Sequence, residues 1–481
     1  MTPRGKLPFG QKLGYSAGQV VDGIVSQSLS IFLLFYVTTV CGLPGGLAGI
    51  ALATGLMVDA VMDPLIGSLS DGWRSRMGRR LPFMLAGLPA VALLFVAIFT
   101  LPTGLGTMAL FAWLTLLSVL LRIAMSLFIL PYSAVGAELS EDYVERSSIM
   151  AWRWGIGMLG TLVAVVLGFG IFFAGPGGTA NHGAYTPFAI TLAVIFVIGG
   201  LISGPVVGRT LDRQYPPAFG EGGIHTRVLR ELGEVFRNRS FRVLFGSALL
   251  FFSALGTHAT LGLHTNTFFW HFTSAQTQIV TLAVFAGLLL GAPLAGPLLK
   301  RLEKRTVLLI GLVGLAVSET VPAGLRLLGL FPFQGTILMW VLSGIVFVGG
   351  ILMAAAAIAF ASMMADAADE HEHLFGARRE GLYYAGWAFA SKAAAGVGAL
   401  IAGTVLQIIH FPTDLAEHGG LAARLPDGMI HWLGFFYGPG AGLLYLGAII
   451  ATFLYRLDAS SHAGIMRDLT ERRAATVVAI P

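Results

Sequence analysis

Long apolar stretches separated by short polar breaks fill the chain from residue 13 to residue 456. A helix that crosses a bilayer needs about 20 mostly apolar residues. The pattern therefore predicts an all-α membrane protein with twelve transmembrane helices. They are expected near 13–41, 47–71, 83–102, 107–138, 149–175, 187–209, 242–269, 275–299, 306–328, 336–365, 382–410 and 433–456.

A long polar segment in the middle of the chain separates the first six spans from the last six. The pattern predicts an N-terminal six-helix half (1–211), a cytoplasmic linker (212–240) and a C-terminal six-helix half with a cytoplasmic tail (241–481). The basic loop after the second span, Asp71–Arg80, has a weak counterpart after the eighth, Lys300–Arg305. Repeated halves around a midplane site are the common plan of secondary transporters.

The composition supports lipid as the solvent. Hydrophobic residues make up 56% of the chain and charged residues only 11%, less than half the roughly 25% typical of soluble domains. With one cysteine, Cys41, no intramolecular disulfide can form. The Lys and Arg residues lie mainly in alternate loops, which predicts an inner (plasma) membrane protein with both termini in the cytoplasm. The net charge of +5 then needs no nucleic-acid partner, and the chain is expected to work as a monomer.

Charged side chains at membrane depth are the best pointers to function. Each one costs roughly 2.5–3.5 kcal/mol on insertion scales, so those that persist are expected to have a role. The predicted spans contain Asp22, Asp59, Asp63, Arg122, Arg153 and Lys392.

Asp59 and Asp63 are four residues apart, so a helix places both carboxylates on one face. Two like charges at this spacing repel each other, and a cation would relieve the repulsion. Na⁺ favours oxygen ligands, and one shared proton would serve as well. The pair is therefore predicted to bind the coupling cation, with no other cofactor. The alternative is a salt bridge to Arg153 or Lys392.

Two further features belong to this region. Pro64 has no backbone N–H, so it leaves the Ala60 carbonyl available as a ligand or creates a kink. Asp22 shares a helix face with Tyr15 and could add a carboxylate to the cation site or accept a hydrogen bond from a substrate hydroxyl. A purely structural acceptor is the other interpretation of Asp22.

A second group of residues is suited to an organic solute. Arg153 lies between Trp152 and Trp154, and a guanidinium beside aromatic faces suits sugars and amphipathic solutes. Tryptophans at the membrane interface are the competing explanation. Lys392 shares a helix face with Tyr384 and would supply a cationic donor from the second half.

The remaining polar residues are assigned from their local sequence pattern. Arg122 either compensates the acidic cluster or attracts acidic substrates, and compensation is preferred. His258, His264 and His271 are interpreted as polar cavity residues, because no zinc spacing accompanies them. The run Asp369–His373 is assigned to a cytoplasmic loop as a solvated charge network without a metal. The sequence contains no nucleotide or Ser-His-Asp motif, which argues against an ATP-driven pump or an enzyme.

Several motifs resemble a known family. Gly67–Asp71 followed by Gly78–Arg80 resembles the loop signature of the major facilitator superfamily. Asp59–Pro64 together with Arg74–Arg80 is similar to the glycoside-pentoside-hexuronide:cation symporters, the relatives of melibiose permease. The resemblance covers nearly the whole chain and implies a fold of two pseudo-symmetric six-helix halves.

The resemblance implies roles for particular residues. Asp59 and Asp63 would bind the cation, Arg153 would approach the substrate, and Lys392 would lie near both sites. Asp22 falls one place from the family's sugar-binding aspartate. The substrate-binding residues expected are Asp22, Tyr15, Arg153, Trp152, Lys392, Tyr384 and Arg122. The gating residues expected at the cytoplasmic contact between the halves are Asp71, Arg74, Arg76, Gly78, Arg79 and Arg80.

One departure from the family pattern concerns the substrate. Sugar-transporting relatives carry an aspartate where this chain has Ile129, before Leu130 and Pro131. A hydroxyl acceptor is therefore missing, which disfavours galactosides, and Arg122 makes a uronide or another acidic solute more plausible. The function expected is secondary active import of a sugar, glycoside or uronide with Na⁺ or H⁺. The alternatives are transport of a lysolipid or another organic solute, a membrane-embedded enzyme and a nontransporting sensor.

Overall fold

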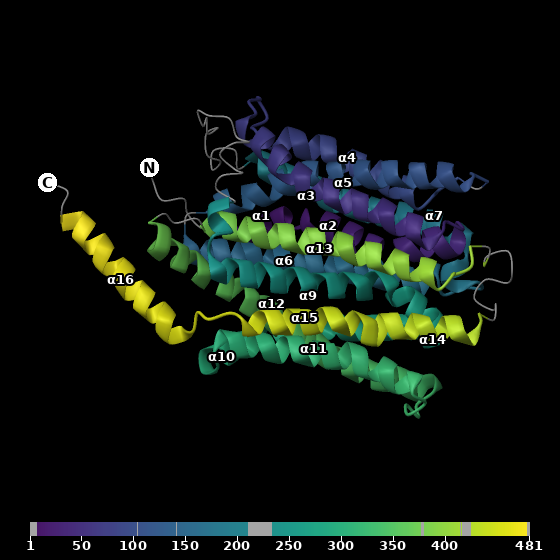
Figure 1. Ribbon diagram of the computed structural model, residues 1–481. Coiled ribbons are helices and arrows are strands. Elements are labelled where there is room, and N and C mark those ends of the chain that lie inside the picture. Colours follow the sequence, from purple (N-terminus) through teal and green to yellow (C-terminus); the bar gives the residue numbers. More distant parts are fainter. Residues whose placement is uncertain are drawn as a thin grey trace. The chain divides into compact units, whose positions relative to one another are not determined.

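The computed structural model describes residues 7–102, 104–140, 142–209, 233–376, 380–413, 415 and 425–478. The secondary structure within these residues is helical (Figure 1). The α-helices are α1 (Phe9–Ser16), α2 (Gln19–Ser28), α3 (Gly45–Gly72), α4 (Leu81–Ile98), α5 (Thr107–Glu138), α6 (Tyr143–Leu167), α7 (His182–Arg209), α9 (Arg239–His264), α10 (Ser274–Arg301), α11 (Lys304–Leu327), α12 (Gly335–Phe375), α13 (Glu380–Ile408), α14 (Asp427–Phe435), α15 (Ala441–Phe453) and α16 (Ala459–Val478). Short π-helical segments are η1 (Leu29–Leu33), η2 (Tyr36–Val40), η3 (Gly168–Phe172), η6 (Thr265–Phe269) and η8 (Phe436–Gly440), and η4 (Gly178–Ala180) is a 3₁₀ turn.

Eleven helical segments of the described chain, from Gly45–Gly72 to Asp427–Phe453, are long and apolar enough to cross a membrane. The first predicted span, 13–41, is instead a series of shorter pieces, α1, α2, η1 and η2. Ala17 and Gly18 keep right-handed helical dihedrals between α1 and α2, so the helical path continues through the interruption. With this interrupted span, the architecture agrees with the predicted twelve-helix fold class.

Two other helices, α5 and α7, come very close to the chain at this interruption. A Cβ on Gly18 would lie 2.6 Å from the ring of Tyr132 and 2.8 Å from the hydroxyl of Ser203. Glycine is therefore required at this position by packing, since any side chain would push α5 and α7 away.

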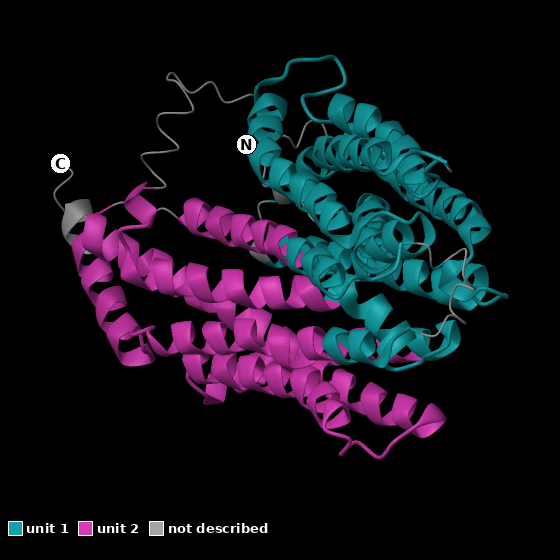
Figure 2. Cartoon of the chain, turned by 45° about the vertical axis from the view of Figure 1, so that its right-hand side comes forward, with its two compact units in different colours: residues 1–220, 259–278, 399–433 teal, residues 221–258, 279–398, 434–481 magenta. Residues whose placement is uncertain are grey.

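Contacts divide the chain into two compact units, shown in two colours in Figure 2. Unit 1 contains 1–220, 259–278 and 399–433, and unit 2 contains 221–258, 279–398 and 434–481. Helices α9 and α13 therefore each contribute to both units. The predicted division at 212–240 stays a prediction, and residues 212–232 of that linker lie outside the described residues.

Segments far apart in the sequence pack together inside unit 1. A Cβ on Gly403 of α13 would collide with the backbone of Gly45 and Gly49 in α3. Nearby, the hydroxyl of Thr38 lies 2.9 Å from Nε2 of His264. These close approaches explain why the end of α13 and the 259–278 segment group with the N-terminal helices.

Inside unit 2, α11 packs against α12 and α15 around a core of buried apolar side chains. Phe360, Met363 and Met364 of α12 are completely buried there. Large apolar side chains also cover parts of the surface, among them Leu443, which is 68% exposed. Exposed apolar side chains on spanning helices are what contact with lipid requires.

α12 also corrects one sequence-based assignment. Its helix continues to Phe375, ten residues past the predicted end of that span, so Asp369–His373 is helical and the prediction of a loop was wrong. The left-handed residue Gly376 (φ +74°) ends the helix. Arg378 and Arg379, which follow this run in the sequence, lie outside the described residues.

Candidate cation and substrate site

The two acidic residues of α3 converge on one hydroxyl group. Ser126 Oγ of α5 lies 2.8 Å from Oδ1 of Asp59 and 2.7 Å from Oδ1 of Asp63. Asp59 is only 5% exposed, while Asp63 is partly buried. The structure therefore brings both carboxylates together on one face, as the spacing predicted, and adds a hydroxyl group from a second helix.

Ser126 was not among the residues singled out from the sequence. It lies 67 residues from Asp59, and a serine in an apolar helix is a weak signal on its own. One signal was available, because Ser126 follows the predicted charged residue Arg122 by one helical turn and so shares its face. Helix α3 continues through Pro64, and the kink or available Ala60 carbonyl expected there stays a prediction.

Arg122 lies on the same side of α5, in electrostatic range of Asp59, Asp63 and Asp22. One guanidinium thus lies in range of three carboxylates, and charge compensation by Arg122 stays a prediction. Asp22 also accepts hydrogen bonds from Nε2 of Gln19 and Oγ of Ser26, each at 2.9 Å. The roles of Arg122 and Asp22 toward a substrate stay predictions.

Arg153 meets a tyrosine pair that the sequence did not connect with it. Its guanidinium carbon is 5.9 Å from the centroid of the Tyr132 ring. Tyr132 in turn stacks on Tyr15 with centroids 4.7 Å apart. Tyr15 is fully buried and donates a hydrogen bond to the Tyr132 carbonyl. It therefore holds the Tyr132 ring in place beside Arg153.

Trp152 lies elsewhere. Its side chain is 40% exposed and packs edge-on against Phe9 with centroids 5.3 Å apart. The aromatic ring next to Arg153 in this structure is thus Tyr132. The predicted role of Trp152 in substrate binding stays a prediction.

Lys392 and Tyr384 are both on α13 in the part that belongs to unit 2. Lys392 is partly buried, and Tyr384 is 40% exposed. The other predicted ligands, among them Asp22 and Arg153, belong to unit 1. A substrate site shared by the two groups therefore stays a prediction.

The loop between α3 and α4 is anchored on the end of α5. Nη2 of Arg79 and of Arg80 both contact Oε1 of Glu138, the latter at 2.8 Å, and Arg80 also pairs with Asp71 at 3.0 Å. Gly78 has φ +81°, which allows the loop to turn. Glu138 was missed from the sequence, because it lies 59 residues from Arg79.

The remaining loop residues Arg74 and Arg76 are exposed. The charge pairing predicted for this loop therefore exists inside unit 1. Its predicted role in gating at a contact between the halves stays a prediction.

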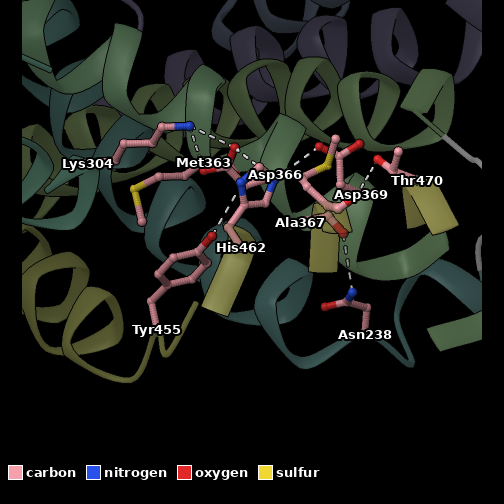
Figure 3. Close-up of polar contacts among 10 residues, drawn as sticks. Asn238, Lys304, Met363, Asp366, Ala367, Asp369, Tyr455, His462 and Thr470 are labelled. Atoms are coloured by element: carbon pink, nitrogen blue, oxygen red, sulfur yellow. Dashed lines mark hydrogen bonds and ion pairs between the residues drawn. The ribbon is translucent and has the colours of Figure 1, made fainter. Parts of the chain in front are cut away.

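Unit 2 contains a similar arrangement (Figure 3). Lys304, at the start of α11, places Nζ 2.7 Å from both carboxylate oxygens of Asp366 in α12. The similarity between the two basic loops thus extends to the structure. In each case a basic residue of the loop contacts a carboxylate on the second helix after that loop, which is α5 for the first loop and α12 for the second. In unit 2 the ring of His462 from α16 joins the cluster, 3.1 Å from Asp369 and 3.7 Å from Asp366.

The chain is similar to known transport proteins in sequence and in fold. A family model described as MFS/sugar transport protein matches residues 14–459. The chain is 24% identical to an uncharacterized symporter of Synechocystis sp., over 97% of this chain and 98% of that protein. It is 23% identical to a putative glycoside/cation symporter of Escherichia coli, over 99% of this chain and 98% of that protein. Among solved structures, a D323A mutant of the nucleoside transporter NupG matches with a TM-score of 0.66 at 13% identity, over 92% of this chain and 98% of that one, which shows the shared fold.

The fold and these similarities define a multi-pass inner-membrane transporter, not an enzyme. This chain belongs to the MFS/sugar transport protein family. The resemblance to the glycoside-pentoside-hexuronide symporters, noted from the Asp59–Pro64 and Arg74–Arg80 motifs, is thereby confirmed.

Proposed function

We propose that the protein imports a sugar, glycoside or uronide together with Na⁺ or H⁺ by alternating access. The observation that carries this proposal is the contact of one hydroxyl, that of Ser126, with both Asp59 and Asp63. The family and the glycoside/cation symporter among the relatives support the same substrate class.

The single hydrogen of the Ser126 hydroxyl limits how many carboxylates it can donate to. A serine hydroxyl has one hydrogen to donate, and ionised carboxylates only accept hydrogen bonds. Ser126 can therefore donate to Asp59 or to Asp63, but not to both. The other contact is satisfied when a carboxyl group carries a proton or when a cation is shared by the oxygens. Both coupling ions left open by the sequence, Na⁺ and H⁺, fit this oxygen cluster.

The substrate is proposed to bind near Arg153, on the side where its guanidinium lies over Tyr132. Gln19 and Ser26 each donate a hydrogen bond to Asp22. These two bonds would hold the Asp22 carboxylate in position to accept a further hydrogen bond from a substrate hydroxyl. Because Ile129 replaces the family's acidic residue in α5, an acidic sugar such as a uronide is favoured over a galactoside. Lys392 of α13 is likewise proposed to contact the substrate.

The basic loops support a proposed orientation of the protein in the membrane. Arg79, Arg80 and Lys304 lie at helix ends in loops that are rich in Arg and Lys. Such loops are retained in the cytoplasm, so both termini are proposed to lie there. The transporter is proposed to work as a monomer.

Uptake into proteoliposomes tests the function. A panel of sugars, uronides and lysolipids would first be screened for thermal stabilisation of the purified protein, with and without Na⁺. The solute found would then be used to measure accumulation driven by a Na⁺ or pH gradient. Asp59→Asn and Asp63→Asn are expected to abolish accumulation, with Asp427→Asn as a control at an exposed carboxylate. Undiminished accumulation in both acidic-pair variants would refute the cation assignment, and a lysolipid as the only stabilising solute would refute the substrate class.

A further inference from the structure

Unit 2 contains an ionisable pair that the proposed function does not use. Nδ1 of His258 in α9 lies 3.3 Å from Oε2 of Glu319 in α11. The side chains are 7% and 17% exposed. From the sequence, His258 is assigned to a polar cavity, whereas Glu319 lies within the predicted span 306–328 and was not singled out.

Glu319 lies deep in its spanning helix. It is the sixteenth residue of α11, which begins at Lys304 and has 24 residues. At a rise of about 1.5 Å per residue, Glu319 lies about 22 Å from the Lys304 end and about 12 Å from the other end. This position lies inside the spanning segment, more than two helical turns from either end of α11.

The surroundings of the pair are aromatic. The ring of Tyr437, in η8, meets His258 edge-on with centroids 4.5 Å apart. Tyr445, in α15, is fully buried with its ring centroid 6.0 Å from that of His258. Both tyrosines lie in electrostatic range of Glu319. Among the described residues, the hydroxyl of Tyr445 and both ring nitrogens of His258 have no hydrogen-bond partner, so the 3.3 Å contact of Nδ1 with Glu319 is an ion-pair distance without hydrogen-bond geometry.

Permanent charges on the neighbouring helices do not neutralise Glu319. Across the described residues, its only ion-pair partner is His258. Arg326 is two turns further along α11, and the stretch of α12 from 335 to 360 has no charged residue. On α13, which packs against α9 at Gly256, the charged side chain within the span is Lys392.

Electrostatics then restricts the protonation state of the pair. An ionised carboxylate beside a neutral imidazole would be a buried net charge, which is very costly in an apolar medium. A carboxylate beside an imidazolium still requires that two charges be desolvated. A protonated Glu319 that donates toward Nδ1 of a neutral His258 avoids both costs, and the distance allows that hydrogen bond after a small rotation.

We propose that Glu319 and His258 form a second cation-binding site of this transporter, which binds a single proton on Glu319. The site is separate from the acidic pair, because Asp59 and Asp63 belong to unit 1 and this pair to unit 2. Its part in the transport cycle rests on the proposed function, whereas binding of the proton does not. If the acidic pair binds Na⁺, this site makes accumulation depend on pH as well.

Infrared difference spectroscopy of the reconstituted protein tests the site without any substrate. The comparison uses a background that carries Asp59→Asn and Asp63→Asn, so that a proton on the acidic pair contributes no band. This background is expected to show the carbonyl stretch of a protonated carboxyl group in an apolar environment, and adding Glu319→Gln is expected to remove it. Adding His258→Leu should move the band to higher frequency, because the acceptor of its hydrogen bond is gone. The control substitution Asp427→Asn should leave the band of the background unchanged. A band that persists after Glu319→Gln is added, or that is identical with and without His258→Leu, would overturn the proposal.

A transport measurement tests the role in coupling. In proteoliposomes with a pH gradient as the only driving force, Glu319→Gln is expected to lower solute accumulation about tenfold or more, while Asp427→Asn matches the wild type. Unchanged accumulation in Glu319→Gln would overturn the coupling role. Failure of the Asp59 and Asp63 assignment would appear in those variants alone and would leave the infrared result intact.

Discussion

Tyr15 and Tyr132 hold each other by a reciprocal pair of hydrogen bonds: the hydroxyl of Tyr15 donates to the Tyr132 carbonyl at 2.8 Å, and the hydroxyl of Tyr132 donates to the Tyr15 carbonyl at 3.0 Å. The two rings stack between these bonds. This arrangement fixes the interrupted first span to α5 and positions the ring that Arg153 faces.

Removing one of these hydroxyls should destabilise the protein without removing the aromatic platform. Tyr15→Phe and Tyr132→Phe are each expected to lower the free energy of unfolding by about 1 kcal/mol, the usual contribution of a buried hydrogen bond. Unfolding in detergent, measured for both single variants and the double variant, would give the coupling between the two bonds. A loss of solute affinity in Tyr132→Leu but not in Tyr132→Phe would assign the ring itself to the substrate site. Equal affinity in both would exclude the ring from that site.

Ser126→Ala should weaken cation binding. A hydrogen bond to a charged group contributes about 1.5–3 kcal/mol, so the apparent cation affinity is expected to fall about tenfold to a hundredfold. The matched control is Ser118→Ala, since Ser118 is a buried serine two turns earlier in α5 that packs on Gly55. Cation-dependent uptake across a concentration series measures the effect. An equal loss in both serine variants would show that the effect comes from packing and not from the contact with the acidic pair.

Glu138→Gln should destabilise the loop that α5 anchors. Arg79 and Arg80 are 8% and 4% exposed, so loss of the carboxylate leaves two buried cations short of negative charge. Removing one partner of a buried ion pair costs about 3–5 kcal/mol. Thermal unfolding in detergent would test this, with Arg76→Gln as the comparison at an exposed position of the same loop. A similar, small effect of both substitutions would contradict the anchoring role of Glu138.

Gly403→Ala should disrupt the seam between α13 and α3 in unit 1. The new Cβ would collide with the backbone of Gly45 and Gly49, and overpacking of this kind costs about 1–3 kcal/mol. At Gly246 of α9 an added Cβ meets open space, so Gly246→Ala should stabilise the helix by roughly 0.5–1 kcal/mol. Opposite shifts in the unfolding temperature are therefore expected. A stabilised Gly403→Ala variant would refute the close approach.

Asp458 should control the first turn of α16. Its Oδ1 accepts hydrogen bonds from the backbone N–H of Ser461 and the hydroxyl of Ser460, both at 2.8 Å. These bonds to the charged form lower the pKa of Asp458 to about 2. Because the pKa is lowered by folding, the cap is complete above the ordinary range of an aspartate and is lost only as the pH falls toward about 2.

Hydrogen exchange of the first α16 amides measures this cap. Asp458→Ala is expected to speed exchange at neutral pH, whereas the wild type should keep its protection down to mildly acidic pH. His462→Ala is a useful comparison, since it removes the contact of α16 with Asp366 and Asp369 but leaves the cap. Unchanged exchange in Asp458→Ala would show that packing alone holds the turn.

The hydrophobic pattern by itself determined that this chain crosses a membrane and where its spans lie, because burial in lipid requires about 20 apolar residues in a row whatever the neighbours are. The spacing of Asp59 and Asp63 likewise determined that they share a face, since the helical repeat is a local property. Local patterns were less informative at element ends. The α12 extension through Asp369–His373 was missed because charged residues beyond a span look the same in a loop and in a solvated helix.

Only the tertiary structure decided which side chains meet these residues. Ser126 reaches the acidic pair, Glu138 receives Arg79 and Arg80, and Tyr132 lies below Arg153 because particular helices pack against each other. That packing depends on contacts between residues dozens of positions apart, such as Gly18 against Tyr132 and Gly45 against Gly403, and no local periodicity encodes them. The pairing of His258 with Glu319 has the same origin, since only the packing of α9 and α11 shows that these two residues meet.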